Sequence, residues 1–194
     1  MDGFQRRKER KKDTILFAAL TLFKDFGIKK VSVTEIADQA NVSQVTIYNY
    51  FGSKDDLIHA VMVYYLEEIW RDYEILLDSN LSYDKKIKQI IFKEGEIANQ
   101  ISETFFKEFM TYYKADSYIN DYYTNKVVPR MIQFFDEGKR LGYVNPNISN
   151  DAIFFYIQMF MEYMQREEVN TKMLSLTEDV ITLFFYGIFG KDQN

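Results

Sequence analysis

The strongest structural signal in the chain is the stretch TEIADQANVSQVTIYNYFGSKDDL, residues 34–57. Apolar positions in its first part recur at helical spacing: Ile36, Ala37 and Ala40. Such a pattern predicts a short amphipathic helix. Thr34 stands just before it and can cap its free backbone amides.

A sharp turn is expected directly after that helix. Asn41 falls where the chain needs positive φ, which Asn tolerates best after Gly. Ser43 is a good N-cap for a second helix over residues 44–51. Two short helices joined by such a turn form a helix-turn-helix, which we place at about residues 33–52.

The second helix has an unusual polar face. Ile47 and Phe51 supply one apolar stripe, whereas the other faces carry Gln44, Val45, Thr46, Tyr48 and Asn49. A purely structural helix would more often carry Lys and Glu there. Gln and Asn can pair with adenine, Thr can contact thymine methyl groups, and Tyr can reach phosphates. This pattern favours DNA recognition.

The residues before this motif are helical and basic. An amphipathic helix ending at Gly27 is predicted by Ile15, Leu16, Ala19, Leu22, Phe23 and Phe26. Residues 4–12 carry six positive charges, which suit either a solvated terminus or an arm on the DNA backbone. Residues 1–54 have a net charge of +4 and residues 55–194 of −9. A small nucleic-acid-binding module joined to an acidic body is therefore indicated.

The motif resembles the DNA-binding segment of the TetR family of bacterial transcriptional repressors. The likeness covers about 55 residues from near Lys12, and the rest is similar only in length and helical texture. The residues at the family's spacing are Ile36, Ala37, Ala40, Val42, Ser43, Thr46, Tyr48, Phe51, Lys54 and Leu57. Asn41 replaces the usual Gly, and Val45 replaces a usually small residue.

The resemblance implies roles in DNA binding. Base edges or adjacent phosphates would be contacted by Ser43, Gln44, Val45, Thr46 and Asn49, and the backbone held by Thr34, Tyr48, Tyr50 and Lys54. Tyr50 could instead pack against the first helix. The expected protein is all-α, with about nine helices. Residues 1–53 would form the arm and DNA-binding head, and residues 54–194 a ligand-sensing and dimerisation body.

Composition excludes several other classes. The chain has no cysteine and one histidine, His59, so thiolate chemistry and His-pair metal sites are excluded. A lone His on a helix is most often a surface or packing residue, and no nucleophile motif accompanies it. We therefore expect no catalytic residues, metal or cofactor. No apolar run could span a bilayer, so we expect a cytoplasmic protein without a membrane partner.

The body is rich in aromatic residues and could hold a ligand. Glu94 lies on the apolar stripe of a helix over residues 83–100, so it either pairs with a protein Lys, Arg or Tyr, lies exposed at the edge, or recognises a cationic effector. The candidate pocket comprises Glu94, Phe105, Phe109, Tyr112, Tyr113 and Phe155. The alternative for the aromatic residues is ordinary core packing.

The last two helices are too apolar for a monomer surface. We expect one to begin at Ser149 or Asn150, and the last to be capped by Ser175 or Thr177 and to end near Phe189. A homodimer interface is predicted at Tyr156, Phe160, Tyr163, Phe184 and Gly187. An internal helical hairpin is the alternative.

Together these features predict a ligand-responsive regulator, most simply a repressor. It would bind a palindromic double-stranded operator as a homodimer and be released by a small hydrophobic effector. The alternative functions are a helical enzyme or a protein-interaction module that does not bind DNA.

Overall fold

The computed structural model describes residues 3–164 and 167–189, without the side chains of residues 4, 114–115, 160–161, 164, 167–174 and 187–189. All regular structure within these residues is helical. In chain order the helices are α1 (Gly3–Phe26), α2 (Val33–Gln39), α3 (Gln44–Phe51), α4 (Lys54–Asp78), α5 (Tyr83–Asn99), α6 (Glu103–Ala115), α7 (Ser117–Tyr122), the π-helical turn η1 (Tyr123–Val127), α8 (Val128–Leu141), α9 (Asn150–Met164) and α10 (Glu167–Phe189).

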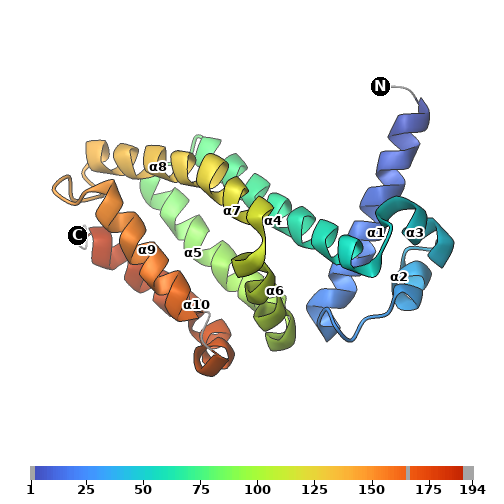
Figure 1. Cartoon of the computed structure of the whole chain (residues 1–194). Coiled ribbons are helices and arrows are strands. Elements are labelled where there is room, and N and C mark those ends of the chain that lie inside the picture. Colours follow the sequence, from blue (N-terminus) through green and yellow to red (C-terminus); the bar gives the residue numbers. More distant parts are fainter. Residues whose placement is uncertain (1–2, 165–166, 190–194) are drawn as a thin grey trace.

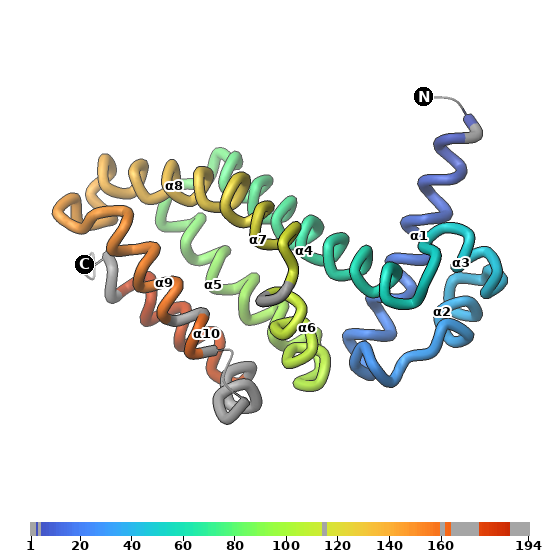
Figure 2. Tube along the Cα trace, viewed as in Figure 1, coloured from blue at the N-terminus to red at the C-terminus, as the bar shows by residue number. Residues whose placement is uncertain are grey.

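The molecule is elongated, with α1, α2 and α3 forming a head at one end (Figure 1). Helix α4 runs from this head into a body built from α5 to α10. The start of α1 and the end of α10 lie at opposite ends of the molecule (Figure 2). Helices α7 and α8 are joined without a break by η1. When these three are counted as one continuous helix, the described residues form nine helices. The all-helical prediction is confirmed.

A capping box starts α2. The Ser32 hydroxyl accepts from the Glu35 amide, and the Glu35 carboxylate accepts from the Ser32 amide at 2.7 Å. The prediction that Thr34 is the cap is therefore wrong, because α2 begins at Val33 and Thr34 lies inside its first turn.

The turn between α2 and α3 has the predicted geometry. Asn41 has a φ of 52°, and it is the non-glycine residue with positive φ in the described structure. Ser43 caps α3, since its hydroxyl accepts from the Thr46 amide at 3.1 Å. These local interactions set the angle at which α3 leaves α2.

Two apolar clusters hold the molecule together. The first joins the head to α4 and α6; its fully buried members include Phe23, Ile36, Ile47, Leu57 and Phe105. The second fills the far part of the body; its members include Trp70, Tyr83, Phe134, Phe135 and Ile153. Because the first cluster crosses the proposed boundary at residues 53–54, the head packs directly on the body. The two-domain division stays a prediction.

Polar contacts fasten the end of α1 to α6. The Ser102 amide donates to the Lys24 carbonyl at 2.8 Å. The Glu108 carboxylate accepts from the Ile28 amide at 2.5 Å. Between them, Gly27 has a φ of +85°, and a Cβ there would lie 2.6 Å from a methyl carbon of α6. The end of α1 therefore approaches α6 at a place where only glycine fits. We call these contacts the α1–α6 latch.

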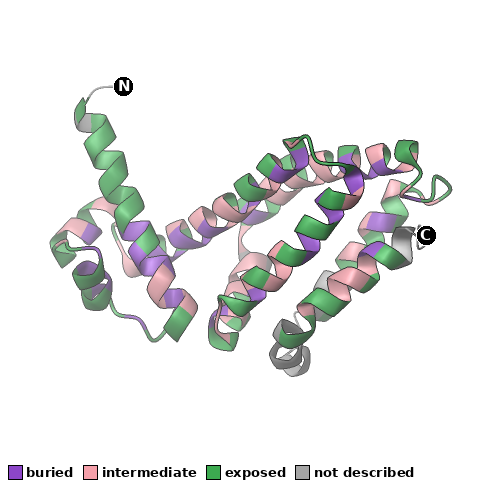
Figure 3. Ribbon diagram, turned by 180° about the vertical axis from the view of Figure 1, so that it is seen from behind, coloured by how far each residue is buried: buried purple, intermediate pink, exposed green. Residues whose placement is uncertain are grey.

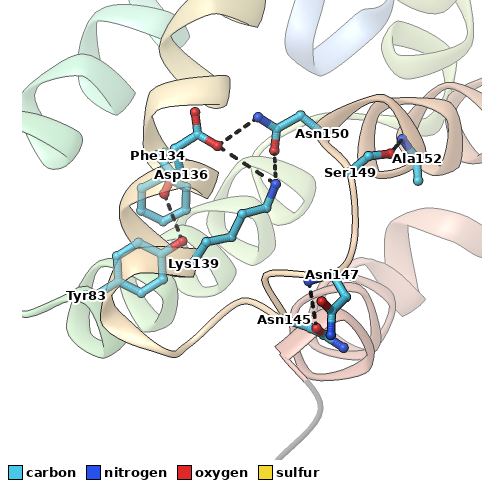
Figure 4. A network of polar contacts seen from close by, with 9 residues as sticks. All are labelled: Tyr83, Phe134, Asp136, Lys139, Asn145, Asn147, Ser149, Asn150 and Ala152. Atoms are coloured by element: carbon cyan, nitrogen blue, oxygen red, sulfur yellow. Dashed lines mark hydrogen bonds and ion pairs between the residues drawn. The ribbon is translucent and has the colours of Figure 1, made fainter.

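The corner between α8 and α9 is fixed by side-chain hydrogen bonds (Figure 4). Lys139 Nζ donates to Asn150 Oδ1 at 2.6 Å, and Asn150 Nδ2 donates to Asp136 Oδ1 at 2.8 Å. Ser149 accepts from the Ala152 amide at 3.1 Å, so Ser149 supplies the predicted cap of α9.

The start of the last helix differs from the prediction. Helix α10 begins at Glu167, so Ser175 and Thr177 lie within it and do not cap it. Hydroxyl residues can sit inside a helix as well as at its start, and the sequence pattern did not separate these cases.

No helix in the described part of the chain is long and apolar enough to cross a lipid bilayer.

Candidate nucleic-acid interface and body site

Helix α3 presents an uncharged face to solvent. Ile47 is buried in the first apolar cluster and fixes the rotation of the helix. The side chains left exposed are Gln44, Val45, Tyr48 and Asn49, with Thr46 half-buried. Val45 is 67% exposed and Tyr48 45%, which is unusual for large side chains on a short helix. This face can contact base edges without the strong charge of a purely phosphate-binding surface.

Several polar groups on this face are already hydrogen-bonded. Gln44 Nε2 donates to Thr34 Oγ1 at 2.9 Å, which links α3 to α2. The hydroxyls of Ser43 and Thr46 lie 2.9 Å apart and share a hydrogen bond. While Gln44 holds Thr34, one of its two amide N–H donors is occupied, and the second N–H and the carbonyl oxygen remain. Among the described residues, the Asn49 side chain has no such partner, so its whole amide is available.

The other candidates for contacting DNA are Lys54 and the basic start of α1. Lys54 Nζ donates to the Val31 carbonyl at 2.7 Å, so this ammonium already holds the loop before α2. Residues 5–12 are exposed helix, and the first turns of α1 project from the head (Figure 1). Tyr50 is half-buried, and it packs against the first cluster and the Phe51 ring. This packing is the alternative that the sequence left open for Tyr50, and its contact with DNA stays a prediction.

In the body, the half-buried Glu94 has a partner within the protein. The Tyr73 hydroxyl donates to Glu94 Oε1 across α4 and α5. Burial raises the pKa of Glu94, and the hydrogen bond from Tyr73 opposes this only in part. Burial and the Glu94 charge also raise the pKa values of Tyr73 and Tyr65. The Glu–Tyr pair is one of the alternatives that the sequence left open.

The structure separates the other candidate pocket residues. Phe105 is fully buried and Phe109 partly, and both pack edge-on against Tyr65 at 5.5 and 5.3 Å between ring centroids. Tyr112 and Tyr113 pack at the edge of the same cluster. These α6 residues therefore build the core that joins head and body. Phe155 is 70% exposed on α9, which groups it with the interface candidates.

Trp70 is a body residue that sequence reasoning passed over. It is 5% exposed, and its ring lies 6.4 Å from that of Tyr73. Its indole nitrogen is a fully buried side-chain polar atom without a hydrogen-bond partner in the described structure. The one available signal was that Trp70 is the single tryptophan of the chain.

Helices α9 and α10 expose large apolar side chains. Figure 3 colours the chain by how far each residue is buried. Tyr156 is 46% exposed and stacks on the half-buried Phe184 at 5.8 Å. Tyr163 is also exposed. The side chain of Phe160 and the surroundings of Gly187 lie outside what the structure describes. Sequence reasoning missed three further side chains that are each at least 49% exposed, namely Met159, Leu183 and Tyr186.

His59 lies in a hollow of about 400 Å³ between α1, α4 and α7. Its Nδ1 pairs with Asp116 Oδ2 at 2.7 Å, and nearby the Tyr118 hydroxyl donates to Glu67. Asp116 also caps α7 through the Ile119 amide. The His–Asp pair links α4 to α7. The described residues that line the hollow include no Ser, Thr or Cys.

Comparison with known proteins identifies the head. The profile described as "Bacterial regulatory proteins, tetR family" matches residues 15–61, which run from α1 through α2 and α3 into α4. Over these residues the chain matches the TetR family. The chain is 29% identical over 86 residues to the transcriptional repressor KstR2 of Mycolicibacterium smegmatis, a match covering 44% of this chain but only 42% of that protein.

Two further relatives extend the similarity to the body. KstR2 of Mycobacterium tuberculosis is 21% identical over 174 residues, covering 81% of each chain. The crystal structure of the transcriptional regulator FadR from Bacillus subtilis, in complex with stearoyl-CoA, superposes with a TM-score of 0.60 at 19% identity. That superposition covers 90% of this chain and 98% of FadR, so the whole fold is shared. Both relatives are named as transcriptional regulators.

Proposed function

We propose that this TetR-family regulator represses transcription by binding a two-fold symmetric operator as a homodimer. A small hydrophobic molecule bound in the body would release it. The observation that carries DNA recognition is the exposed, uncharged face of α3, held in place by the burial of Ile47. Because such a protein acts on the chromosome, we place it in the cytoplasm.

On the head, we assign base reading to Asn49 and Val45. The Asn49 amide can pair with adenine, and the exposed Val45 suits a thymine methyl group. Tyr48 and the basic first turns of α1 would contact phosphates. The remaining candidates would act mainly by holding α3 in place, because their side chains bond to one another: Gln44 to Thr34, and Ser43 to Thr46.

The dimer is proposed to form through α9 and α10. Exposed apolar side chains on both helices are unfavourable in water. A second copy related by two-fold symmetry would bury them against the same surface of its own. Two reading helices related by such an axis would meet successive major grooves. Phe155, Tyr156 and Leu183 are the contacts we expect to be buried most.

The effector site is proposed in the body between α4 and α5 and their neighbours. FadR of Bacillus subtilis was crystallised with stearoyl-CoA, and its fold is shared here. That likeness supports an apolar ligand class but does not give this regulator's ligand. The bond between Tyr73 and Glu94 makes a cationic effector less favourable than the sequence suggested, because the carboxyl is already engaged.

A mobility-shift assay tests this function. The full-length protein should retard a fragment from upstream of its own gene at concentrations that leave an unrelated fragment free. Sedimentation should show one dimer per two-fold site. Equal retardation of both fragments, or a monomer bound to DNA, would contradict the proposal. Asp121→Asn, an exposed change in the body, serves as a matched control and should bind like the native protein.

A further inference from the structure

The indole of Trp70 is a donor that the protein itself leaves without an acceptor. The residue is 5% exposed, and Nε1 is completely covered. Among the described residues it is the one buried side-chain nitrogen or oxygen in this situation. Removing an N–H group from water without supplying a new acceptor is unfavourable. Folded proteins seldom keep such a group without a reason, and a bound partner is one such reason.

Trp70 is part of a polar seam inside an apolar body. Its ring contacts that of Tyr73, one helical turn further along α4. Tyr73 in turn donates to Glu94 on α5. On the other side, Tyr65 is close enough for the Glu94 charge to raise its pKa, although burial contributes more.

This seam lies where the two apolar clusters meet along α4. Tyr65 belongs to the first cluster and Trp70 to the second. A molecule bound between the two clusters would therefore lie close to the indole of Trp70. Apolar surroundings with a few placed polar groups are what small-molecule sites in proteins usually offer.

The chemistry of the seam selects the polar group of such a molecule. Indole Nε1 can only donate, so its partner must be an acceptor, and an ammonium group offers none. An anionic acceptor would be placed near Glu94, and both charges would be desolvated. A neutral oxygen avoids both costs. It also leaves the hydrogen bond between Tyr73 and Glu94 intact.

We propose that the effector carries a neutral hydrogen-bond-accepting oxygen on an apolar skeleton, as in a ketone or an ester, and that Trp70 Nε1 donates to this oxygen. This inference rests on the proposed function, since it assigns the chemical class of the body ligand. It replaces the cationic ligand that Glu94 suggested in the sequence.

Because Trp70 is the only tryptophan, its fluorescence reports directly on this hydrogen bond. The probes are 2-decanone, decanoate and decyltrimethylammonium, all below micelle-forming concentrations, with affinities measured by calorimetry. We expect 2-decanone to bind tightest and to shift the tryptophan emission to longer wavelength. Trp70→Phe keeps an aromatic ring but removes the donor. It should weaken 2-decanone binding about 2- to 12-fold.

The ammonium probe separates a lost hydrogen bond from damaged packing. Trp70→Phe should weaken any binding of decyltrimethylammonium less than it weakens binding of 2-decanone, because the ammonium probe accepts no hydrogen bond and Phe keeps an aromatic face for the cation. Equal weakening of both probes, or 2-decanone binding without an emission shift, overturns the role of Trp70. Tighter binding of the anion or the cation overturns the ligand class, as does the failure of all three probes. Operator binding is measured separately, so the proposed repressor function stands or fails independently.

Discussion

Glu94 ties α5 to α4 through a single hydrogen bond from the Tyr73 hydroxyl. Tyr73 lies 21 residues earlier in the chain, so the bond forms only because these two helices pack together. The position of Glu94 on an apolar stripe identified a carboxyl group that needs a partner. The charge that suggested a cation-binding site is engaged within the protein.

The raised pKa of Glu94 predicts a pH dependence of stability. The folded state holds the proton more tightly than the unfolded chain, where the pKa is near 4.5. The unfolded state therefore binds fewer protons than the folded state as pH rises above 4.5, and the free energy of unfolding should fall across that range. Urea unfolding at a series of pH values measures this. Glu94→Gln should flatten the dependence, whereas Glu96→Gln at an exposed position of α5 should not.

Substitutions of Asn49 and Lys54 should weaken DNA binding in different ways. Asn49→Ala should cost about 1–3 kcal/mol for the preferred operator and little for other DNA, because it removes a paired base contact. Lys54→Ala should weaken binding to all sequences and lower the salt slope by about one if the ammonium also reaches a phosphate. Fluorescence anisotropy over a range of salt concentrations distinguishes them. An unchanged salt slope would restrict Lys54 to its bond with the Val31 carbonyl.

Helix α6, together with α4, links the head to the body. Its buried Phe105 joins the head's core, and its Glu108 receives the Ile28 amide at the end of α1. A movement of α6 would therefore shift α1, and the shift of α1 would change the position of α3. The sequence predicted the apolar faces of these helices but not which of them meet.

The α1–α6 latch should be measurable in stability and in the response to effector. Glu108→Ala removes a carboxylate bonded to a backbone amide and should lower the free energy of unfolding by about 1–3 kcal/mol. It should also reduce the effect of ligand on operator affinity. Glu103→Gln, exposed in the first turn of α6, is the control and should change both quantities little. Unaltered ligand response in a destabilised Glu108→Ala protein would limit the latch to a structural role.

For the molecule as a whole, the exposed apolar residues of α9 and α10 govern the proposed assembly. Phe155 and Leu183 are 70% and 71% exposed, so neither contributes much to the fold of one subunit. Replacing both by Glu should leave the helical content unchanged, and the buried charges would oppose dimerisation. Sedimentation should then show a monomer, with operator affinity strongly reduced.

The control for this double variant is Asn125→Glu, which adds a charge at an exposed position of η1. It should sediment like the native protein, because Asn125 is not one of the proposed dimer contacts. A Phe155→Glu, Leu183→Glu protein that remains a dimer would place the interface on another face of the body.

Local patterns in the chain were enough to predict the helical class, the helix-turn-helix and the outward face of α3. Those features depend on interactions within a few residues: a cap such as Ser43, a turn residue such as Asn41, and the 3.6-residue spacing that buries Ile47. Where two local patterns competed, local reasoning erred, as with Thr34 in place of Ser32 and with the start of α10.

Other features could be read only from the packed molecule. Tyr73 meets Glu94, Glu108 reaches the end of α1, and Trp70 keeps a buried donor. The first two contacts join residues that are distant in the chain, and the burial of the indole nitrogen depends on neighbours from several helices. All three follow from how whole helices pack against one another, which no pattern within a single helix encodes.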